Sequence, residues 1–232
     1  MSHSAEYLIV AGVAWLRRST ESDWAVTFDD RRVRKGRGAW LLDEHRAAGE
    51  LDGLAWDLQL TELAPPFRTP QRFLRPLASS HLETWPALLV TGSLGDRRLD
   101  GVPGHRARLW GRRQAENWRW AHATLPDGRW AHALAAKVPG LPTITQHGSD
   151  RGGPGLPISR SAREGTSVRI GPYAVEAEAS SFIGLTYRDP DGSERYCYHS
   201  EVAHLRGPGI AVDNAAFEIA GRDKIDGLEL HS

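Results

Sequence analysis

The stretch GHRARLWGRRQAENWRWAHATLPDGRWAH, from Gly104 to His132, decides the fold. Side chains along an extended strand alternate between the two faces of a sheet. Trp118, Trp120 and His122 are therefore predicted to point to one side, away from the residues between them. The alternation indicates a β-strand with an aromatic, histidine-bearing face.

The same stretch predicts the turn and the returning strand. Pro126-Asp127-Gly128 supplies turn residues, and Trp130 and His132 follow directly. The hairpin gathers tryptophan and histidine together. Such a face suits either a heavily packed core or the wall of a pocket for a large apolar ligand.

Strand signals continue along the whole chain. Short runs rich in Val, Leu, Ile and Trp alternate with polar or glycine turns. The predicted strands are Glu6–Leu16, Trp24–Phe28, Ala39–Asp43, Leu54–Leu60, Leu88–Leu94, Arg106–Trp110, Trp118–Ala123, Arg129–Lys137, Ser167–Ile170, Tyr173–Ala179, Ile183–Tyr187 and Glu194–Ala203, with Phe217–Ala220 and Leu228–Leu230 as edge strands. Leu42–Leu51 contains Gly49 among helix formers and is predicted to be a loop or one helical turn. The pattern predicts an all-β, mainly antiparallel protein.

Several short motifs follow one another in a fixed order over residues 50–135. They are Leu58-Gln59-Leu60 before Pro65-Pro66, Gly92-Ser93-Leu94, Gly101, Gly104, Trp110-Gly111-Arg112-Arg113, Trp118-Arg119-Trp120 and Asp127-Gly128. This order resembles the lipocalin-like family that includes carotenoid 1,2-hydratase and AttH-type proteins and, more distantly, tocopherol cyclase. Many members place an Asp-His pair just before the Trp-Gly, where this chain has Ala107-Arg108. The role of that pair is therefore not carried over.

The resemblance implies a lipocalin-like (calycin-type) antiparallel barrel or sandwich. Two small halves, residues 1–100 and 101–232, or a single merged β domain are the arrangements it allows. It also implies a cyclase, isomerase or hydratase that acts on an apolar polyene, terpenoid or polyketide in a tryptophan-lined pocket. The alternatives are a non-catalytic carrier of a hydrophobic small molecule and a structural β protein with an ordinary tryptophan core.

Polar residues beside the aromatic runs are the candidates for chemistry. A neutral imidazole titrates near pH 7 and could relay a proton, a carboxylate could act beside it, and a guanidinium could hold a ligand oxygen. The candidate catalytic residues are His122, as first choice, then His81, Glu83 and Arg108. The predicted lining of the substrate pocket is Trp85, Trp110, Trp118, Trp120, Trp130 and His132. Arg112 and Arg113, next to the Trp-Gly pair, could also contact a ligand.

Other chemistries are weighed on the same residues. Ser79 and Ser80 precede His81, but no G-x-S-x-G elbow of a serine hydrolase is present. Cys197, His199 and Glu201 share a strand face that could be nucleophilic or metal-binding, although a single cysteine at this spacing favours sheet packing with a His–Glu hydrogen bond. His122 and His132 do not match a usual zinc spacing. No metal and no organic cofactor are expected.

Composition narrows the class of partner. The formal net charge is +0 and the pI is about 7.2, which argues against nucleic acid and anionic membranes. No apolar run approaches the roughly 18 residues of a membrane span. The N-terminal apolar run lacks a preceding Lys or Arg and a small-residue cleavage site. We expect a soluble, cytoplasmic protein. The long segments 64–77 and 148–157 are predicted to be binding loops, with a plain linker as the alternative for the second.

Overall fold

A computed structural model of the chain describes residues 3–20, 22–69, 80–111, 115–137, 144–150, 161–162, 167–170, 175–179, 181–188, 192–207 and 210–231. Every regular element in these ranges is a β-strand, and nearly all neighbouring strands pair antiparallel. The predicted all-β fold class is confirmed. The chain divides into unit 1, residues 1–113 with 124–128, and unit 2, residues 114–123 with 129–232.

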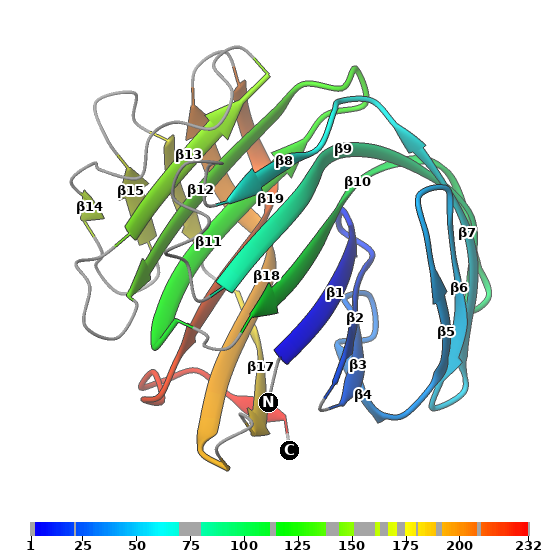
Figure 1. The fold of residues 1–232 in the computed structure, drawn as a ribbon, viewed down its shortest axis with the longest axis horizontal. Helices are drawn as coiled ribbons and strands as arrows, with labels where there is room; N and C mark the ends of the chain where they lie inside the picture. Colours follow the sequence, from blue (N-terminus) through cyan, green and yellow to red (C-terminus); the bar gives the residue numbers. More distant parts are fainter. Residues whose placement is uncertain are drawn as a thin grey trace. The chain divides into compact units, whose positions relative to one another are not determined.

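Unit 1 is a single curled sheet. Its strands are β1 (His3–Val10), β2 (Ala14–Ser19), β3 (Asp23–Thr27), β4 (Arg32–Gly36), β5 (Ala39–Leu42), β6 (Arg46–Leu51), β7 (Leu54–Glu62), β8 (Phe67–Thr69), β9 (Ser80–Leu94) and β10 (Arg97–Gly111). The order is β4-β3-β2-β1-β10-β9-β7-β6-β5, and β8 pairs with β9. The long β9–β10 hairpin arches between β1–β4 and β5–β7 (Figure 1). Residue 100 lies inside β10.

The two ends of this strand order, β4 and β5, are not paired with each other. β4 and β5 are joined directly along the chain, and the connection is tied back to β2 and β3 by hydrogen bonds. The Arg37 guanidinium donates to the carbonyl oxygens of Ser19 and Thr20, at 2.8 and 2.7 Å. The Gly38 amide donates to the Asp23 carboxylate at 3.1 Å. The sheet of unit 1 curls around an interior.

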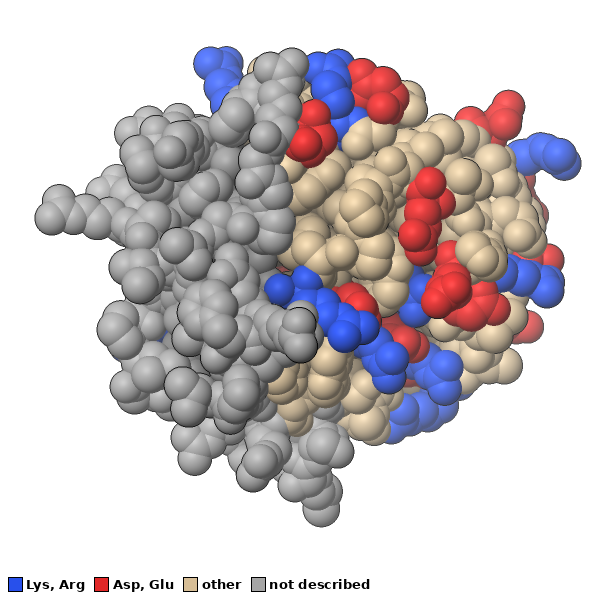
Figure 2. Space-filling view, turned by 45° about the horizontal axis from the view of Figure 1, so that its top comes forward, with Lys and Arg blue, Asp and Glu red and all other residues tan. Residues whose placement is uncertain are grey.

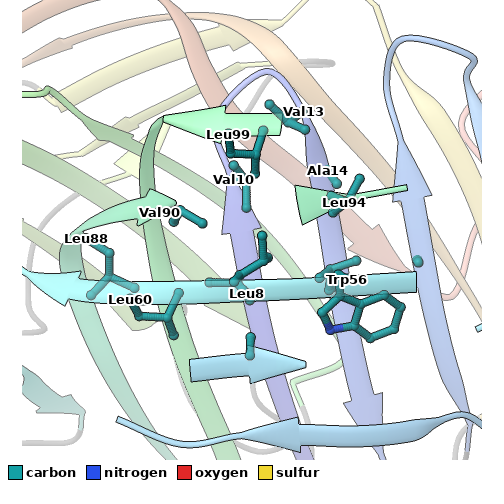
Figure 3. Close-up of a cluster of buried hydrophobic side chains, with 14 of the residues drawn as sticks. Leu8, Val10, Val13, Ala14, Trp56, Leu60, Leu88, Val90, Leu94 and Leu99 are labelled. Atoms are coloured by element: carbon teal, nitrogen blue, oxygen red, sulfur yellow. The ribbon is translucent and has the colours of Figure 1, made fainter. Parts of the chain in front are cut away.

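Apolar side chains fill that interior. Inward positions of β1, β2, β7, β9 and β10 point toward one another in Figure 3. The labelled members are Leu8, Val10, Val13, Ala14, Trp56, Leu60, Leu88, Val90, Leu94 and Leu99. Along β7 burial alternates strictly, as expected for a strand with one face in the core. Each fully buried Leu or Val contributes about 1.5–3 kcal/mol of burial free energy, which fixes the register of these strands.

Two β-bulges bend the β9–β10 hairpin. Between the pairs Leu99↔Gly92 and Val102↔Val90, β10 carries one extra residue, and Gly101 there has a φ of 63°, which favours glycine. Between Gly104↔Leu88 and Arg106↔Trp85, the extra residue is on β9, next to Pro86. Proline cannot donate to a ladder and is tolerated at bulges. Because of this second bulge, both Leu88 and Trp85 face the core although they are three residues apart.

Unit 2 is the second sheet. Its strands are β11 (Asn117–Thr124), β12 (Trp130–Lys137), β13 (Ile144–Ser149), β14 (Ser161–Ala162), β15 (Ser167–Ile170), β16 (Val175–Ala179), β17 (Ile183–Arg188), β18 (Glu194–Gly207), β19 (Ile210–Gly221) and β20 (Leu230–His231). The order is β13-β12-β11-β19-β18-β16-β15-β14, with β17 on β18 and β20 parallel to β17. The predicted β11–β12 hairpin is confirmed.

Three sequence predictions of secondary structure are wrong. The run 6–16 is a hairpin, β1 and β2, because Gly12 adopts a φ of 65° in a turn. Only residues 43–45 of the run Leu42–Leu51 form a turn: β5 ends at Leu42, and the rest is β6, which pairs with β7 and in which Gly49 is packed too closely against Trp56 to accept a side chain. Phe217–Ala220 lies within β19, at the centre of the sheet rather than its edge. Most of segments 64–77 and 148–157 lies outside the described residues.

Candidate functional site

In unit 1 the apolar core gives way to charged groups at one end of β1, β9 and β10. Directly opposite residues in antiparallel strands place their side chains on the same side of the sheet. The registers pair Leu8 with Arg106 and Trp85, Glu6 with Arg108 and Glu83, and Ser4 with Trp110 and His81. We call the following set the charged face: Glu6, Arg68, His81, Glu83, Trp85, Arg106, Arg108 and Trp110. It continues the core-facing side of the sheet, since Trp85 and Leu8 belong to the core.

Arg106 lies where the core meets the charged face. It is 6% exposed, and its guanidinium carbon lies 4.3 Å from the ring centroid of Trp85. One terminal nitrogen donates to the carbonyl oxygen of Asp43, in the β5–β6 turn, and the other is 3.9 Å from the Glu6 carboxylate. Burial lowers the pKa of Arg106, and the Glu6 charge opposes this shift. A guanidinium stays protonated in proteins, so the site holds a nearly buried cation.

The remaining charges of this face are paired and closer to solvent. The Glu83 side chain is 12% exposed and accepts a hydrogen bond from Arg68 Nε at 2.5 Å. The exposed Arg108 lies 3.8 Å from the Glu6 carboxylate and 5.7 Å from the ring of Trp110. Carboxylates and guanidinium groups therefore alternate across the strands, and each charge has an opposite neighbour.

His81 lies at the outer edge of the charged face. Its ring stacks on Trp110 with centroids 5.4 Å apart and an interplanar angle of 22°. Both rings are half-buried. The imidazole is therefore packed against an indole and is still partly exposed.

In unit 2, two histidines and two tryptophans form what we call the Trp–His stack: Trp120, His122, Trp130 and His132. The His122 ring lies nearly parallel to Trp120 and to Trp130, at centroid distances of 5.8 and 6.3 Å and an angle of 9° in both cases. The Trp120 indole donates to His132 Nδ1 at 3.2 Å. His122 is 1% exposed and His132 is fully buried. The stack is a packed cluster in which only Trp120 keeps substantial exposure.

Trp118 faces the same side of the β11 sheet but makes different contacts. Its indole nitrogen donates to Glu218 Oε1 at 3.0 Å. The Arg195 guanidinium carbon lies 4.9 Å from its ring centroid, and Arg195 also donates to the carbonyl oxygen of Glu116. Trp118 thus links a buried carboxylate on β19 to a buried cation on β18.

The structure sorts the predicted site residues into two groups, one in each unit. His81, Glu83, Trp85, Arg108 and Trp110 come together in unit 1. Trp118, Trp120, His122, Trp130 and His132 come together in unit 2. Sequence reasoning missed Arg106 and Glu218. The alternation Arg106, Arg108, Trp110 was available as a signal for the first, whereas Glu218 lies about a hundred residues along the chain from its partner Trp118. Arg112 and Arg113 lie outside the described residues.

In the coloured part of the face shown in Figure 2, both basic and acidic side chains are present, and acidic ones border a run of basic ones. Exposed pairs such as Arg46 with Asp57, at 2.8 Å, belong to this pattern. Within the described part of the chain, no helix has the length and apolar character to cross a membrane.

Two solved structures are similar to this fold. A candidate AttH protein (NE1406) from Nitrosomonas europaea aligns with a TM-score of 0.57 at 12% identity, over 96% of this chain and 92% of that one. CghA aligns with a TM-score of 0.53 at 11% identity, over 97% and 89% of the two chains. At these identities the likeness shows the fold alone.

Sequence comparison is weaker. No family model matches the chain. The uncharacterized proteins MT0513 and Rv0493c, from two strains of Mycobacterium tuberculosis, are each 26% identical over 203 residues. The match covers 72% of this chain and 61% of the length of those relatives. The chain therefore corresponds to only part of the curated proteins that it resembles.

Proposed function

We propose that this protein binds an apolar polyene, terpenoid or polyketide at the charged face of unit 1 and catalyses its cyclisation, isomerisation or hydration. The observation that carries the proposal is the continuity of this face with the apolar core. Leu8 and Trp85 belong to the end of the core, and Arg106 lies directly beside them. One molecule with a hydrocarbon body and one oxygen would meet a matching surface for each part.

Arg106 is suited to hold the oxygen of such a ligand. It is cationic and nearly buried, and its Nε has no hydrogen-bond partner among the described residues. A carbonyl or carboxylate oxygen accepting from this group would be polarised in surroundings of low dielectric constant, where the interaction is stronger than in water. Arg108 would provide a second positive charge nearer the solvent.

His81 and Glu83 would move protons. They alternate on one strand, lie on the same face as Arg106, and are both less buried than His122. In a cyclisation or hydration, one group protonates a double bond or carbonyl and another accepts a proton from carbon or water. His122 stays a candidate for the same role in unit 2, but its ring is enclosed by two indoles.

A non-catalytic carrier is the second candidate. The fold supports it equally, since fold alone does not define function. A further observation favours an enzyme. Four charged side chains lie together on the charged face: Glu6, Glu83, Arg106 and Arg108. A carrier of an apolar molecule does not need paired acids and bases at its binding surface.

The test begins with the ligand. Native mass spectrometry of protein from its own host should reveal a co-purifying apolar metabolite, and a fluorescent conjugated polyene fatty acid should bind and be displaced by it. Glu83→Gln should retain binding and lose turnover of that metabolite, whereas Glu50→Gln, an exposed glutamate on β6, should change neither. Binding of the metabolite without turnover by the unchanged chain would support the carrier. Turnover that survives Glu83→Gln and the corresponding changes at His81 and His122 would exclude these residues as the acid–base groups. Failure of every apolar probe to bind would refute both functions.

A further inference from the structure

Three metal-binding side chains of different chemistry converge inside unit 2. Cys197 and His199 lie on β18 and Glu218 lies directly opposite His199 on β19. One ligand atom from each, the thiol sulfur, a ring nitrogen and a carboxylate oxygen, lie within 4.8 Å of one another. All three residues are buried, with exposures of 1%, 0% and 8%. We propose that Cys197, His199 and Glu218 bind a divalent transition metal, and that zinc is the ion this set favours.

The distance between the cysteine and glutamate ligands fits a tetrahedral ion. Zinc lies about 2.3 Å from a thiolate sulfur and about 2.1 Å from a carboxylate oxygen, so two such ligands on neighbouring corners are roughly 3.6 Å apart. Cys197 Sγ and Glu218 Oε1 are 3.6 Å apart. Thiolate, imidazole and carboxylate together are a combination that zinc accepts, while magnesium and calcium prefer oxygen alone. Three protein ligands leave a fourth position for a solvent or ligand atom.

The surroundings of the three groups support a metal. Leu185 and Ile183 on β17 are paired with Cys197 and His199, so the site has an apolar wall. On the other side, the Trp118 indole donates to Glu218 Oε1 and holds the carboxylate in place. Ligands of zinc sites are commonly oriented by such hydrogen bonds. A cation would compensate the negative charge that a carboxylate and a thiolate bring into this apolar region.

A nucleophilic cysteine is the competing interpretation of these residues. Reactive thiols are partly exposed and lie near positive charge, which lowers their pKa. Cys197 is buried, and its thiol donates to the Glu218 carboxylate at 3.6 Å. The sequence pattern pointed to Glu201 as the third member of this group, whereas the sheet places Glu218 there from the next strand.

The test uses the full chain without an affinity tag, expressed with zinc in the medium. Elemental analysis should find one zinc per chain. Replacement by Co²⁺ should produce a thiolate-to-cobalt charge-transfer band, which has a single source because the chain contains one cysteine. Cys197→Ser should abolish the band. His199→Gln and Glu218→Gln should weaken cobalt binding by at least about tenfold, by comparison with losses at metal sites.

His204→Gln is the matched control, because His204 is an exposed histidine on the same strand. It should bind metal like the unchanged chain. Trp118→Phe should keep the band and weaken binding by about tenfold, because only the orientation of Glu218 is lost. A folded unchanged chain that holds no zinc and gives no cobalt band would overturn the proposal, even if the variants fail to fold. The proposal would also be overturned if His199→Gln and Glu218→Gln bound cobalt with the same affinity as the unchanged chain, because such binding would need only the Cys197 thiol.

Discussion

The two units differ in how far they bury a histidine that packs against tryptophan. Each places a histidine against indole rings on an inward sheet face, His81 on Trp110 in unit 1 and His122 between Trp120 and Trp130 in unit 2. His81 is half-buried and sits among paired charges. His122 is enclosed on both sides and is 1% exposed. One arrangement leaves a ring that can meet a ligand, and the other uses its ring as packing.

Aromatic density alone therefore does not mark a binding surface. The densest tryptophan cluster of the sequence forms the more closed of the two sites. The more open one combines two indoles, Trp85 and Trp110, with a buried cation, Arg106, which lies where the core ends. Accessibility and charge therefore distinguish the candidate catalytic face, and the number of tryptophans does not.

The largest expected difference between the two sites is in the free energy of unfolding that is lost when a tryptophan is removed. Trp130→Ala should destabilise the protein by about 3–5 kcal/mol, because it removes a buried indole from the stack and leaves a cavity. Trp110→Ala should cost clearly less, because its ring is half-buried. Urea denaturation of both variants measures the difference. Equal losses would show that the two clusters are packed alike.

The next effect is on turnover of the co-purified metabolite. His81→Gln keeps hydrogen bonding but removes titration, and we expect turnover to fall by at least about 100-fold while binding persists. His122→Gln should change turnover less than His81→Gln. Steady-state rates, with circular dichroism to check folding, provide the measurement. The reverse order would return the acid–base role to His122, which was the first choice from sequence.

A smaller effect concerns ligand affinity. Arg106→Gln removes the cation over Trp85, and the affinity for an acidic or carbonyl-containing polyene should fall by about tenfold, or about 1.4 kcal/mol. Arg46→Gln is the control, since Arg46 pairs with Asp57 at the surface. Fluorescence titration distinguishes them. If both variants bind alike, the oxygen-binding role of Arg106 is excluded.

The smallest effect is a dependence of stability on pH. Amide hydrogen bonds from His45 and Arg46 hold the pKa of Asp43 below its usual 3.8, and this turn presents its carbonyl oxygen to Arg106. A carboxyl whose pKa is lower in the folded state stabilises that state above pH 3.8 and loses this contribution as the pH falls through the folded value. Asp43→Asn should therefore be less stable than the unchanged chain at pH 7 and should approach it at lower pH. Urea denaturation of both proteins at pH 7 and at a pH below 3.8 measures this. The same difference in the free energy of unfolding at the two pH values would contradict the prediction.

Much of the architecture was accessible from sequence. Period-two alternation correctly predicted that His81, Glu83 and Trp85 share a face and that Trp118, Trp120 and His122 share another. Those predictions hold because alternation is a local property of a strand. The fold class follows from the same local signal repeated along the chain.

What sequence could not provide depends on pairing between distant strands. Glu218 comes to Cys197 and Trp118 only through the β11–β19–β18 order, which no local pattern encodes. The position of Arg106 over Trp85 depends on a bulge that shifts the register of the hairpin. The hairpin of β1 and β2 was hidden because Ala11 to Val13 is nearly as apolar as the strands that it joins.

The bulge beside Pro86 has a consequence for how proteins with this fold could diverge. The bulge changes which residues of β9 face inward. After it along the chain, Leu88 and Val90 face inward, and before it Trp85 and Glu83 do. Deleting one codon there would remove the bulge and leave Trp85 two residues from Leu88, so both would still face inward. Regular pairing without a deletion would instead bring Thr84 and Leu82 inward and turn His81 and Glu83 outward. Relatives could thus lose one residue at this point and still keep the β9 part of the charged face, and aligned sequences should be compared for length in this strand before residue identity.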